Sequence, residues 1–487
     1  MRRSLAFRSP PQPVITALVA GRPSTICSSS PNNLPPTSTN INNEATTTFT
    51  TLLHQYCSPS EATDIVVTVS ESKPTTGRGR GLFMESNHQA TPATILFKVP
   101  LDLCLVVDYT EQQDDNANVD VGGVHLPSQG QWPRVRKGLG TDKPLEWDII
   151  LALALLDAVA GDGGQFWEEY ATAVLPSPPQ LTLPVCLSED LLQDLQHQDI
   201  VDRALQQKRR LRELFPGLAV PMLDSVDDTT TTYLEWAFSC VRSRAFRLGQ
   251  NIFAFVPFLD IANHADCPNA NFQVPVDRQS VNCVSVRDIK CVEEITISYN
   301  GITAPSKIST TSTGSTTEGE RGYTNQRWMA QYGFVPRQGN PFDRIDFSSC
   351  VLPSSPHVLL SVDAFQSILG DGDDMVDVFS GRNIFFYAAL KSFPLAVTES
   401  ETAPMEQQLE VAASMLACVQ REKQEQWKSS VEEDEVELLR LEQEHGSSNS
   451  RREAVVRYRL HRKKLLSAAE KLLTAFTLSA TTTTTST

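Results

Sequence analysis

The sequence lacks several features that identify large classes of protein. None of its 10 cysteines forms a Cys-x-x-Cys pair, so we expect isolated reduced thiols rather than a zinc cluster or a dense disulfide framework. No apolar run reaches the roughly 18 residues that a membrane span needs. Positive charge is also scarce, since the 487 residues carry a formal net charge of −16. Nucleic acid is therefore not the expected partner, because proteins that bind phosphate usually have a basic face.

The N-terminal segment has an unusual composition. Its first 43 residues contain no Asp, Glu or Lys, but carry Arg2, Arg3, Arg8 and Arg22 among many Ser, Thr, Pro and Asn residues. This composition is typical of an organellar transit peptide. We interpret residues 1–45 as a disordered segment that targets the protein to a plastid or a mitochondrion. A disordered tail without a targeting role, on a cytoplasmic protein, is the alternative.

Segments rich in β-branched residues lie on both sides of a mainly helical stretch. Two of them precede this stretch, at 65–69 and 94–100, and others follow it. Such enrichment favours strands, whereas the residues between them are apolar at helical spacing. We predict an α+β domain with a helical insertion, followed by an all-α C-terminal domain. The predicted boundaries are 46–335 for the α+β domain, about 108–248 for its insertion, 340–476 for the C-terminal helices and 477–487 for a disordered tail.

A glycine-rich segment, Gly77-Arg-Gly-Arg-Gly81, lies between two predicted strands. Alternating glycines let a backbone approach a ligand closely, because they have no side chain. The spacing matches neither the dinucleotide-binding nor the Walker phosphate-binding pattern. By itself the segment is best explained as a flexible surface turn, and an Arg-Gly repeat that contacts RNA is a minor alternative. Its interpretation therefore depends on the segments that follow.

The most informative segment is Phe255-Val-Pro-Phe-Leu-Asp-Ile-Ala-Asn-His264. Apolar runs usually end in turn residues. This run ends instead in three side chains that form hydrogen bonds, Asp260, Asn263 and His264. Arg244 lies shortly before it, and a guanidinium group can hold a carboxylate in bidentate geometry. We read this segment as part of a binding or catalytic site, although a strand-end histidine and a helix-surface arginine are each commonly structural.

A third segment, Glu293-Glu-Ile-Thr-Ile-Ser-Tyr299, ends in a tyrosine. Tyrosine at a strand end often serves only in packing, but its hydroxyl can also donate or accept a hydrogen bond at a reacting centre. A loop rich in Ser, Thr and Gly follows at 301–324. Beyond this loop, Tyr332 and Phe334 lie in the segment Asn325-Gln-Arg-Trp-Met-Ala-Gln-Tyr-Gly-Phe-Val335.

Together and in this order, the segments resemble those of SET-domain protein methyltransferases, in the branch typified by the Rubisco large-subunit lysine methyltransferase. The resemblance covers about residues 63–343 by motif. It implies S-adenosylmethionine as the cofactor and Tyr299 as the catalytic residue. It also implies that Arg78 and Arg80 act through main-chain atoms, and that Arg244 pairs with the cofactor carboxylate. The implied cofactor-binding residues are Arg78, Gly79, Arg80, Gly81, Arg244, Asn263, His264 and Tyr299.

The resemblance also implies the reaction and the partner. Tyr332 and Phe334 would wall a channel for the substrate, and residues 340–476 would bind a protein substrate. Many nuclear histone methyltransferases carry a cysteine-rich zinc segment that this chain lacks, so we expect methylation of a lysine in a non-histone protein by a monomeric enzyme that needs no metal. Two alternatives remain: methylation of a histidine by the same fold, and a non-catalytic adaptor that keeps the SET fold.

Overall fold

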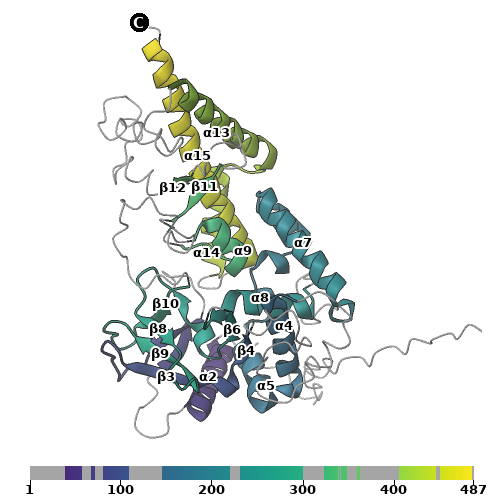
Figure 1. The fold of residues 1–487 in the computed structure, drawn as a ribbon, viewed down its shortest axis with the longest axis vertical. Coiled ribbons are helices and arrows are strands. Elements are labelled where there is room, and N and C mark those ends of the chain that lie inside the picture. The colour runs from purple at the N-terminus through teal and green to yellow at the C-terminus, as the bar shows by residue number, and fades with distance from the viewer. Residues whose placement is uncertain are drawn as a thin grey trace, which may run out of the picture.

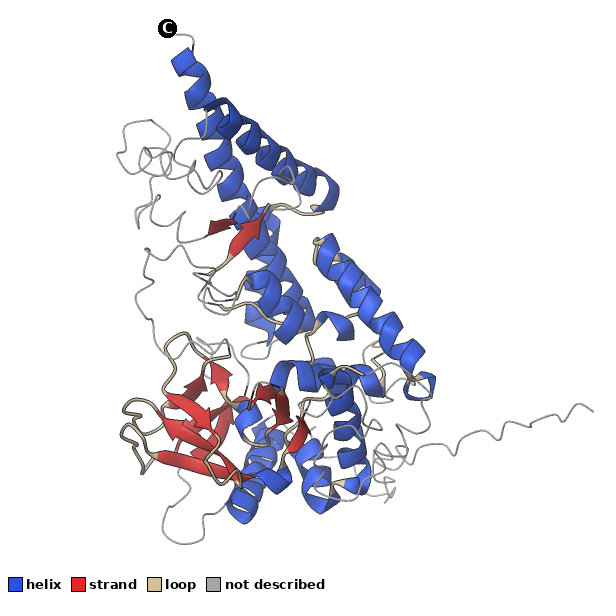
Figure 2. Cartoon of the chain, in the orientation of Figure 1, coloured by secondary structure: helices blue, strands red, loops and turns tan. Residues whose placement is uncertain are grey.

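The computed structural model describes a strand-rich part with packed helices, from which a helical C-terminal region extends (Figure 1 and Figure 2). The described residues are 39–57, 67–71, 80–108, 145–219, 231–249, 251–299, 323–337, 339–340, 342–347, 359–361, 405–445 and 450–484.

Three small sheets make up the strand-rich part. The first has the strand order β1-β2-β10-β7, the second β3-β9-β8 and the third β4-β6-β5. The strands of the first sheet are β1 Val67–Glu71, β2 Arg80–Met84, β10 Glu294–Ile297 and β7 Asn263–His264. Those of the second are β3 Ile95–Pro100, β9 Ser280–Ser285 and β8 Ala270–Gln273. Those of the third are β4 Leu105–Asp108, β6 Ile252–Phe255 and β5 Ala245–Arg247.

Strand β10 brings the three sequence motifs together. It pairs antiparallel with β2, so that Ile295 lies opposite Leu82. On its other side it pairs parallel with β7, so that Thr296 lies opposite Asn263 and Ile297 opposite His264. The glycine-rich segment, the Asn-His pair and the strand that leads to Tyr299 therefore become neighbours in one sheet.

Helices of the insertion pack beside these sheets, together with an N-terminal helix. Helix α4 is apolar on all sides and is buried from Asp148 to Leu156, as expected for a helix in a protein core. Helix α8 begins at a capping box in which Thr232 and Glu235 bond each other's backbone N–H groups. The helices are α2 Thr39–Cys57, α4 Trp147–Asp157, α5 Gly164–Ala173, α6 Glu189–Gln193, α7 Gln198–Leu214 and α8 Tyr233–Arg244.

Short helical turns connect these elements. They are the π turn η3 Ala158–Asp162 and the 3-10 turns η1 Leu101–Leu103, η4 Pro178–Gln180, η5 Pro184–Cys186, η6 Pro216–Leu218 and η7 Leu259–Ile261. Among the described residues, no single helix is long and apolar enough to cross a membrane, although the bent pair Trp147–Ala160 and Gly164–Ala173 meets that criterion by length and composition.

The C-terminal region consists mainly of helices that pack along one long helix. Helices α13 and α14 both lie against α15. Strands β11 and β12 form a small antiparallel sheet beside them, with Ile345 opposite Leu360. The elements are α9 Asn325–Tyr332, β11 Arg344–Asp346, β12 Leu359–Ser361, α13 Met405–Gln426, α14 Val431–His445 and α15 Arg451–Thr484.

The contact between the C-terminal helices and the insertion contains many buried polar groups. Arg451 donates to the backbone carbonyls of Pro178 and Leu181. His197 lies within 2.5 Å of the Tyr458 hydroxyl, and the two rings stack. An apolar cluster that includes Ile200, Met329 and Val455 surrounds these contacts. The two regions are therefore joined by a packed interface and not only by the chain between them.

The α+β class predicted from the sequence is confirmed, and some local features differ. Within the predicted helical insertion, helix α8 ends at Arg244 and a strand follows, because Phe246 pairs with Ala254 and packs on Phe272. The region from 340 was predicted to be entirely helical, yet it contains β11 and β12.

Three further features lie outside the predicted pattern. Helix α2 begins at Thr39, before the predicted start of the folded domain. Helix α15 continues through Thr484, past its predicted end at residue 476 and into the residues predicted to be a disordered tail. Cys418 is disulfide-bonded, whereas we expected reduced thiols throughout the chain.

The interface predicts a pH dependence of stability. Burial, together with the positive charges of Arg462 and Arg203, lowers the pKa of His197 to about 2. Unfolding lets this histidine titrate near its ordinary pKa of about 6.5. The unfolded chain therefore binds more protons below that pH, and the free energy of unfolding falls as the pH decreases from about 6.5 toward 2. The contribution of His197 approaches about 1.4 kcal/mol per pH unit.

We expect His197→Asn to remove this contribution and to flatten the dependence between pH 6.5 and 5. Urea unfolding of the wild type and of His197→Asn at several pH values measures the dependence. All other titrating groups are common to the two proteins, so the difference between their curves is the contribution of His197. Parallel curves for the two proteins would contradict the prediction.

Candidate active site

Asn263 links all three sequence motifs. Its side-chain amide donates to the backbone carbonyl of Arg80 at 3.3 Å and to Oε1 of Glu294 at 2.8 Å. Arg80 belongs to the glycine-rich segment and Glu294 to the strand that precedes Tyr299. A single amide therefore fixes the distance between strands β2, β7 and β10 at the end of the sheet where the motifs meet.

His264 has a defined orientation and tautomer. The backbone N–H of Tyr299 donates to Nδ1 of His264 at 3.2 Å, so that nitrogen must be an acceptor. The proton of the neutral ring then resides on Nε2, which lies 3.1 Å from a carboxylate oxygen of Asp266. The His264 side chain, only 8% exposed, is thus a structural partner of the tyrosine segment in this arrangement.

Tyr299 itself is half-buried, and its phenol points toward the Asn-His pair. The hydroxyl donates to the backbone carbonyl of Ala262 at 2.8 Å. The hydroxyl gives its proton to this bond, so its oxygen acts as an acceptor toward any further partner. The tyrosine therefore presents a fixed acceptor beside Asn263.

The glycine-rich segment is described from Arg80 onward, so the predictions for Arg78 and Gly79 lie outside the described residues. Gly81 is buried in β2, opposite Ser70. The Arg80 carbonyl accepts from Asn263, in line with a main-chain role. Its side chain has a definite role as well, contrary to our expectation. The guanidinium donates to the carbonyls of Ala173 at 2.9 Å and Val174 at 2.7 Å. These groups end helix α5, where a positive charge is favourable.

Arg244 belongs to a buried polar network. Its Nη1 donates to the Asp260 carboxylate at 3.0 Å and to the Asp260 backbone carbonyl at 3.1 Å. The other carboxylate oxygen of Asp260 accepts from the Tyr170 hydroxyl at 2.5 Å. Burial raises the pKa of Asp260, and the Arg244 guanidinium and the Tyr170 hydroxyl oppose that rise. The predicted carboxylate-binding arginine is therefore already held by one protein carboxylate.

The backbone beside this network is strained. Phe258 has φ 69° and ψ −44°, and the N–H of Leu259 bonds the carbonyl of Pro257 at 2.8 Å. This is a γ-turn, and a positive φ at a bulky residue costs on the order of 1–3 kcal/mol. The buried Phe258 ring packs edge-to-face on Phe49 and Tyr170, so the surrounding core holds the turn in place.

A cluster of aromatic rings adjoins Tyr299. Tyr332 lies 5.0 Å from Tyr299, and Phe334 lies 6.2 Å from Tyr332, measured between ring centroids. The two residues predicted as channel walls thus reach the site. Trp328 was not singled out from the sequence, although it lies one helical turn before Tyr332. It is buried and lies within 6.2 Å of five other rings, which belong to His264, Tyr299, Tyr323, Tyr332 and Phe334.

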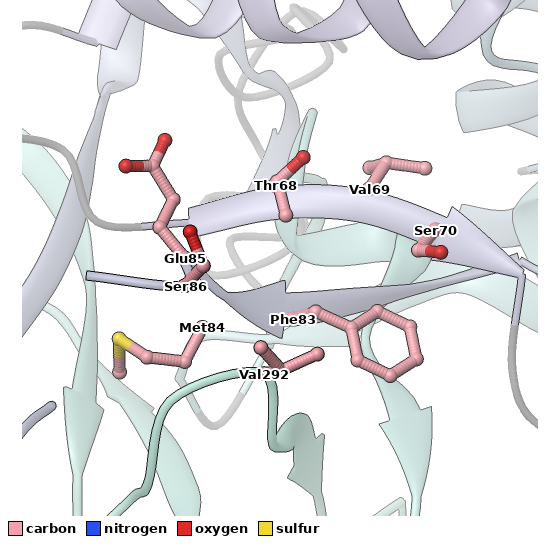
Figure 3. A pocket seen from close by; sticks show the side chains of 8 residues that line it. All are labelled: Thr68, Val69, Ser70, Phe83, Met84, Glu85, Ser86 and Val292. Carbon is pink, nitrogen blue, oxygen red and sulfur yellow. The ribbon is translucent and has the colours of Figure 1, made fainter. Parts of the chain in front are cut away.

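A separate hollow of about 560 Å³ lies over strands β1 and β2 (Figure 3). It is open to solvent, and none of the residues that line it is a predicted site residue. Its lining is Thr68, Val69, Ser70, Phe83, Met84, Glu85, Ser86 and Val292. We therefore do not assign the site to this hollow. Within the described residues, no three His, Cys, Asp or Glu side chains come together as metal ligands would.

Comparison with known proteins identifies the domain. Residues 79–300 match the family model of the SET domain. No curated protein matches the chain. Among solved structures, the SET domain of LSMT bound to lysine and AdoHcy has 15% sequence identity and a TM-score of 0.51, and the match covers 89% of this chain and 91% of that one. Rubisco LSMT bound to AdoMet has 16% identity and a TM-score of 0.52, with 91% and 93% covered.

Residues 79–300 are therefore a SET domain, and this prediction from the motifs is confirmed. The fold of the chain is similar to that of Rubisco LSMT over most of both chains. The functional roles of the individual site residues remain predictions.

The buried network makes a prediction about stability. Asp260→Ala would leave the Arg244 guanidinium and the Tyr170 hydroxyl without their shared partner. We expect the free energy of unfolding to fall by about 3–5 kcal/mol, because a charge with a lost partner inside a protein is strongly destabilising. Glu444→Ala is the matched control. It removes an exposed pair with Arg440 and should cost less than about 1 kcal/mol. Urea unfolding measures both. Equal losses would show that Asp260 is not the centre of a buried network.

Proposed function

We propose that the protein is an S-adenosylmethionine-dependent protein N-methyltransferase that acts on a lysine side chain of a non-histone protein. The observation that carries the proposal is the position of the Tyr299 hydroxyl, which is fixed on the Ala262 carbonyl between the Asn-His pair and the aromatic cluster. The similar LSMT structures supply the substrate class, since their ligands are lysine and methyl-lysine together with AdoHcy.

The donor set of the site fits the cofactor. Both bonds of Arg244 to Asp260 use Nη1, so Nη2 and Nε are free of that pairing and can bind a carboxylate in bidentate geometry. Asn263 contacts the glycine-rich strand at the Arg80 carbonyl, next to Gly81, which has no side chain to keep a ligand from the backbone. When bound, S-adenosylmethionine supplies a methyl group on a positively charged sulfur.

The chain's own residues prepare the acceptor amine. A lysine must lose a proton before it can act as a nucleophile. The aromatic side chains around Tyr299 would keep water from an amine bound among them, and a dry environment favours the neutral amine. The Tyr299 hydroxyl is held in one orientation and can orient the amine through its oxygen. Positioning of this kind accounts for a large share of the rate in many enzymes.

Two alternatives are tested by separate measurements. A histidine acceptor would give methyl-histidine after hydrolysis of the labelled product. A non-catalytic adaptor need not bind the cofactor, so calorimetry with S-adenosylmethionine distinguishes it from an enzyme. Methylation of an organelle lysate with labelled cofactor, followed by mass spectrometry of the labelled protein, tests the proposal directly. Labelled methyl-lysine supports it, and cofactor binding without any labelled product would contradict it.

We assign protein recognition to the region predicted as the C-terminal domain, 340–476, in a monomeric enzyme. Helix α14 supports this assignment because it exposes Val436 and Leu439, which are 68% and 58% exposed. These side chains are one helical turn apart and form a small apolar contact surface among acidic neighbours.

We also propose that residues 1–45 direct the protein into a plastid or mitochondrion, because of their arginine content and lack of acidic residues. We expect a fluorescent reporter fused to these residues to accumulate in one organelle, as seen by microscopy in plant cells. The reporter without the segment is the control. Diffuse fluorescence from the fusion would contradict targeting.

The role of Tyr299 gives a kinetic prediction. Tyr299→Phe should reduce kcat by about 100-fold, since one positioned hydrogen bond at a reacting centre is worth on the order of 3 kcal/mol. The affinity for S-adenosylmethionine should change little, because the ring and its packing remain. Tyr458→Phe is the control, as the Tyr458 hydroxyl pairs with His197 in the interface between the insertion and the C-terminal helices. Steady-state kinetics and calorimetry give both quantities. A loss of less than about twofold in kcat would contradict the catalytic role.

A further inference from the structure

Tyr170 reaches the site from helix α5 of the insertion. Its side chain is fully buried, and its hydroxyl bonds both Asp260 and the backbone of Phe258. We propose that Tyr170 is a positioning residue, which orients Arg244 through Asp260 so that the guanidinium can hold the carboxylate of the cofactor. This inference rests on the proposed function.

The hydrogen bonds form a directed chain. The Tyr170 hydroxyl donates to Oδ1 of Asp260 at 2.5 Å. The other oxygen, Oδ2, accepts from Arg244 at 3.0 Å. The two oxygens of a carboxylate turn together as one planar group. A hydrogen bond to one oxygen therefore restricts the rotation of the group and the position of the other oxygen. The tyrosine therefore determines the direction in which Arg244 presents the rest of its guanidinium group.

The same hydroxyl also holds the backbone. It accepts from the N–H of Phe258 at 2.7 Å, the residue at the centre of the strained γ-turn. This turn leads into Asp260 within two residues and into Asn263 within five. A single side chain from the insertion thus fixes both the carboxylate and the segment that carries the Asn-His pair.

Helix α5 supports the other side of the site as well. Its C-terminal carbonyls, those of Ala173 and Val174, accept hydrogen bonds from the Arg80 guanidinium. The helix that provides Tyr170 therefore binds both the glycine-rich strand and the Asn-His segment. Core packing requires only the ring of a tyrosine. The bonds of the Tyr170 hydroxyl to Asp260 and Phe258 therefore indicate a role beyond packing.

The removal of the hydroxyl alone separates positioning from packing. Tyr170→Phe keeps the ring, which packs on Phe258 and Trp167. Tyr458→Phe is the matched control, because Tyr458 is also buried and its hydroxyl also has a buried partner, His197. That pair lies in the interface between the insertion and the C-terminal helices, away from Arg244.

Two ligands report on the carboxylate contact. S-adenosylhomocysteine contains an amino-acid carboxylate, whereas 5′-deoxy-5′-methylthioadenosine has the nucleoside and sulfur without it. By calorimetry, we expect Tyr170→Phe to weaken S-adenosylhomocysteine binding about tenfold or more, and to change methylthioadenosine binding by less than about twofold. Tyr458→Phe should change neither. In an Arg244→Ala background, Tyr170→Phe should have no further effect on S-adenosylhomocysteine binding.

Equal weakening of both ligands, or no weakening of either, would overturn the inference. If the wild-type protein binds neither ligand, the proposed function fails instead, so the two failures are distinguishable. If Tyr170→Phe does not melt cooperatively, Asp260→Asn provides the same comparison, since it keeps an acceptor for Tyr170 but turns an amide group toward Arg244. Equal loss of both ligands in that variant would likewise contradict a role through Arg244.

Discussion

The structure around the site depends on one buried carboxylate. Asp260 has a fully buried side chain, and a buried charge is tolerated only when it is paired and hydrogen-bonded. Arg244 from the end of α8 and Tyr170 from α5 satisfy its two oxygens. Two helices of the insertion are consequently anchored to the turn that leads into Asn263 and His264. The insertion is therefore part of the site's framework and not an appendage to the sheets.

Strand β10 provides the second constraint. It is paired with β2 on one side and β7 on the other, and these pairings differ in direction. A slip of one residue in either pairing would turn the alternate side chains to the wrong face of the sheet. The Asn263 side chain, bonded to the Arg80 carbonyl and to Glu294, holds the register from within. This explains why residues almost two hundred positions apart meet reproducibly.

The sequence predicted the class of fold and the main polar residues because each motif has a local signature. Asn263 and His264 stand out because they follow an apolar run directly, and Tyr299 because it ends a strand. Tyr170 has no such signal, since a tyrosine in a helix with aromatic neighbours reads as packing. Trp328 was missed for the same reason. The bonds of Arg80 to helix α5 were also missed, because a contact across 93 residues depends on tertiary structure that no local pattern contains.

The charges of the C-terminal region show how its helices are held in position against each other and against the insertion. Asp434 on α14 is buried with Arg459 and Lys463 of α15, and its pairing with both cations satisfies the carboxylate. Arg452 of the same helix pairs with Asp194 in the insertion. These ion pairs add little stability compared with apolar packing, but a wrong register would leave a buried charge unpaired at a cost of several kcal/mol. The same logic applies at Asp260. In both places a buried carboxylate selects one arrangement of helices. The positions of the α14 surface and of the site near Tyr299 are therefore both fixed relative to the insertion.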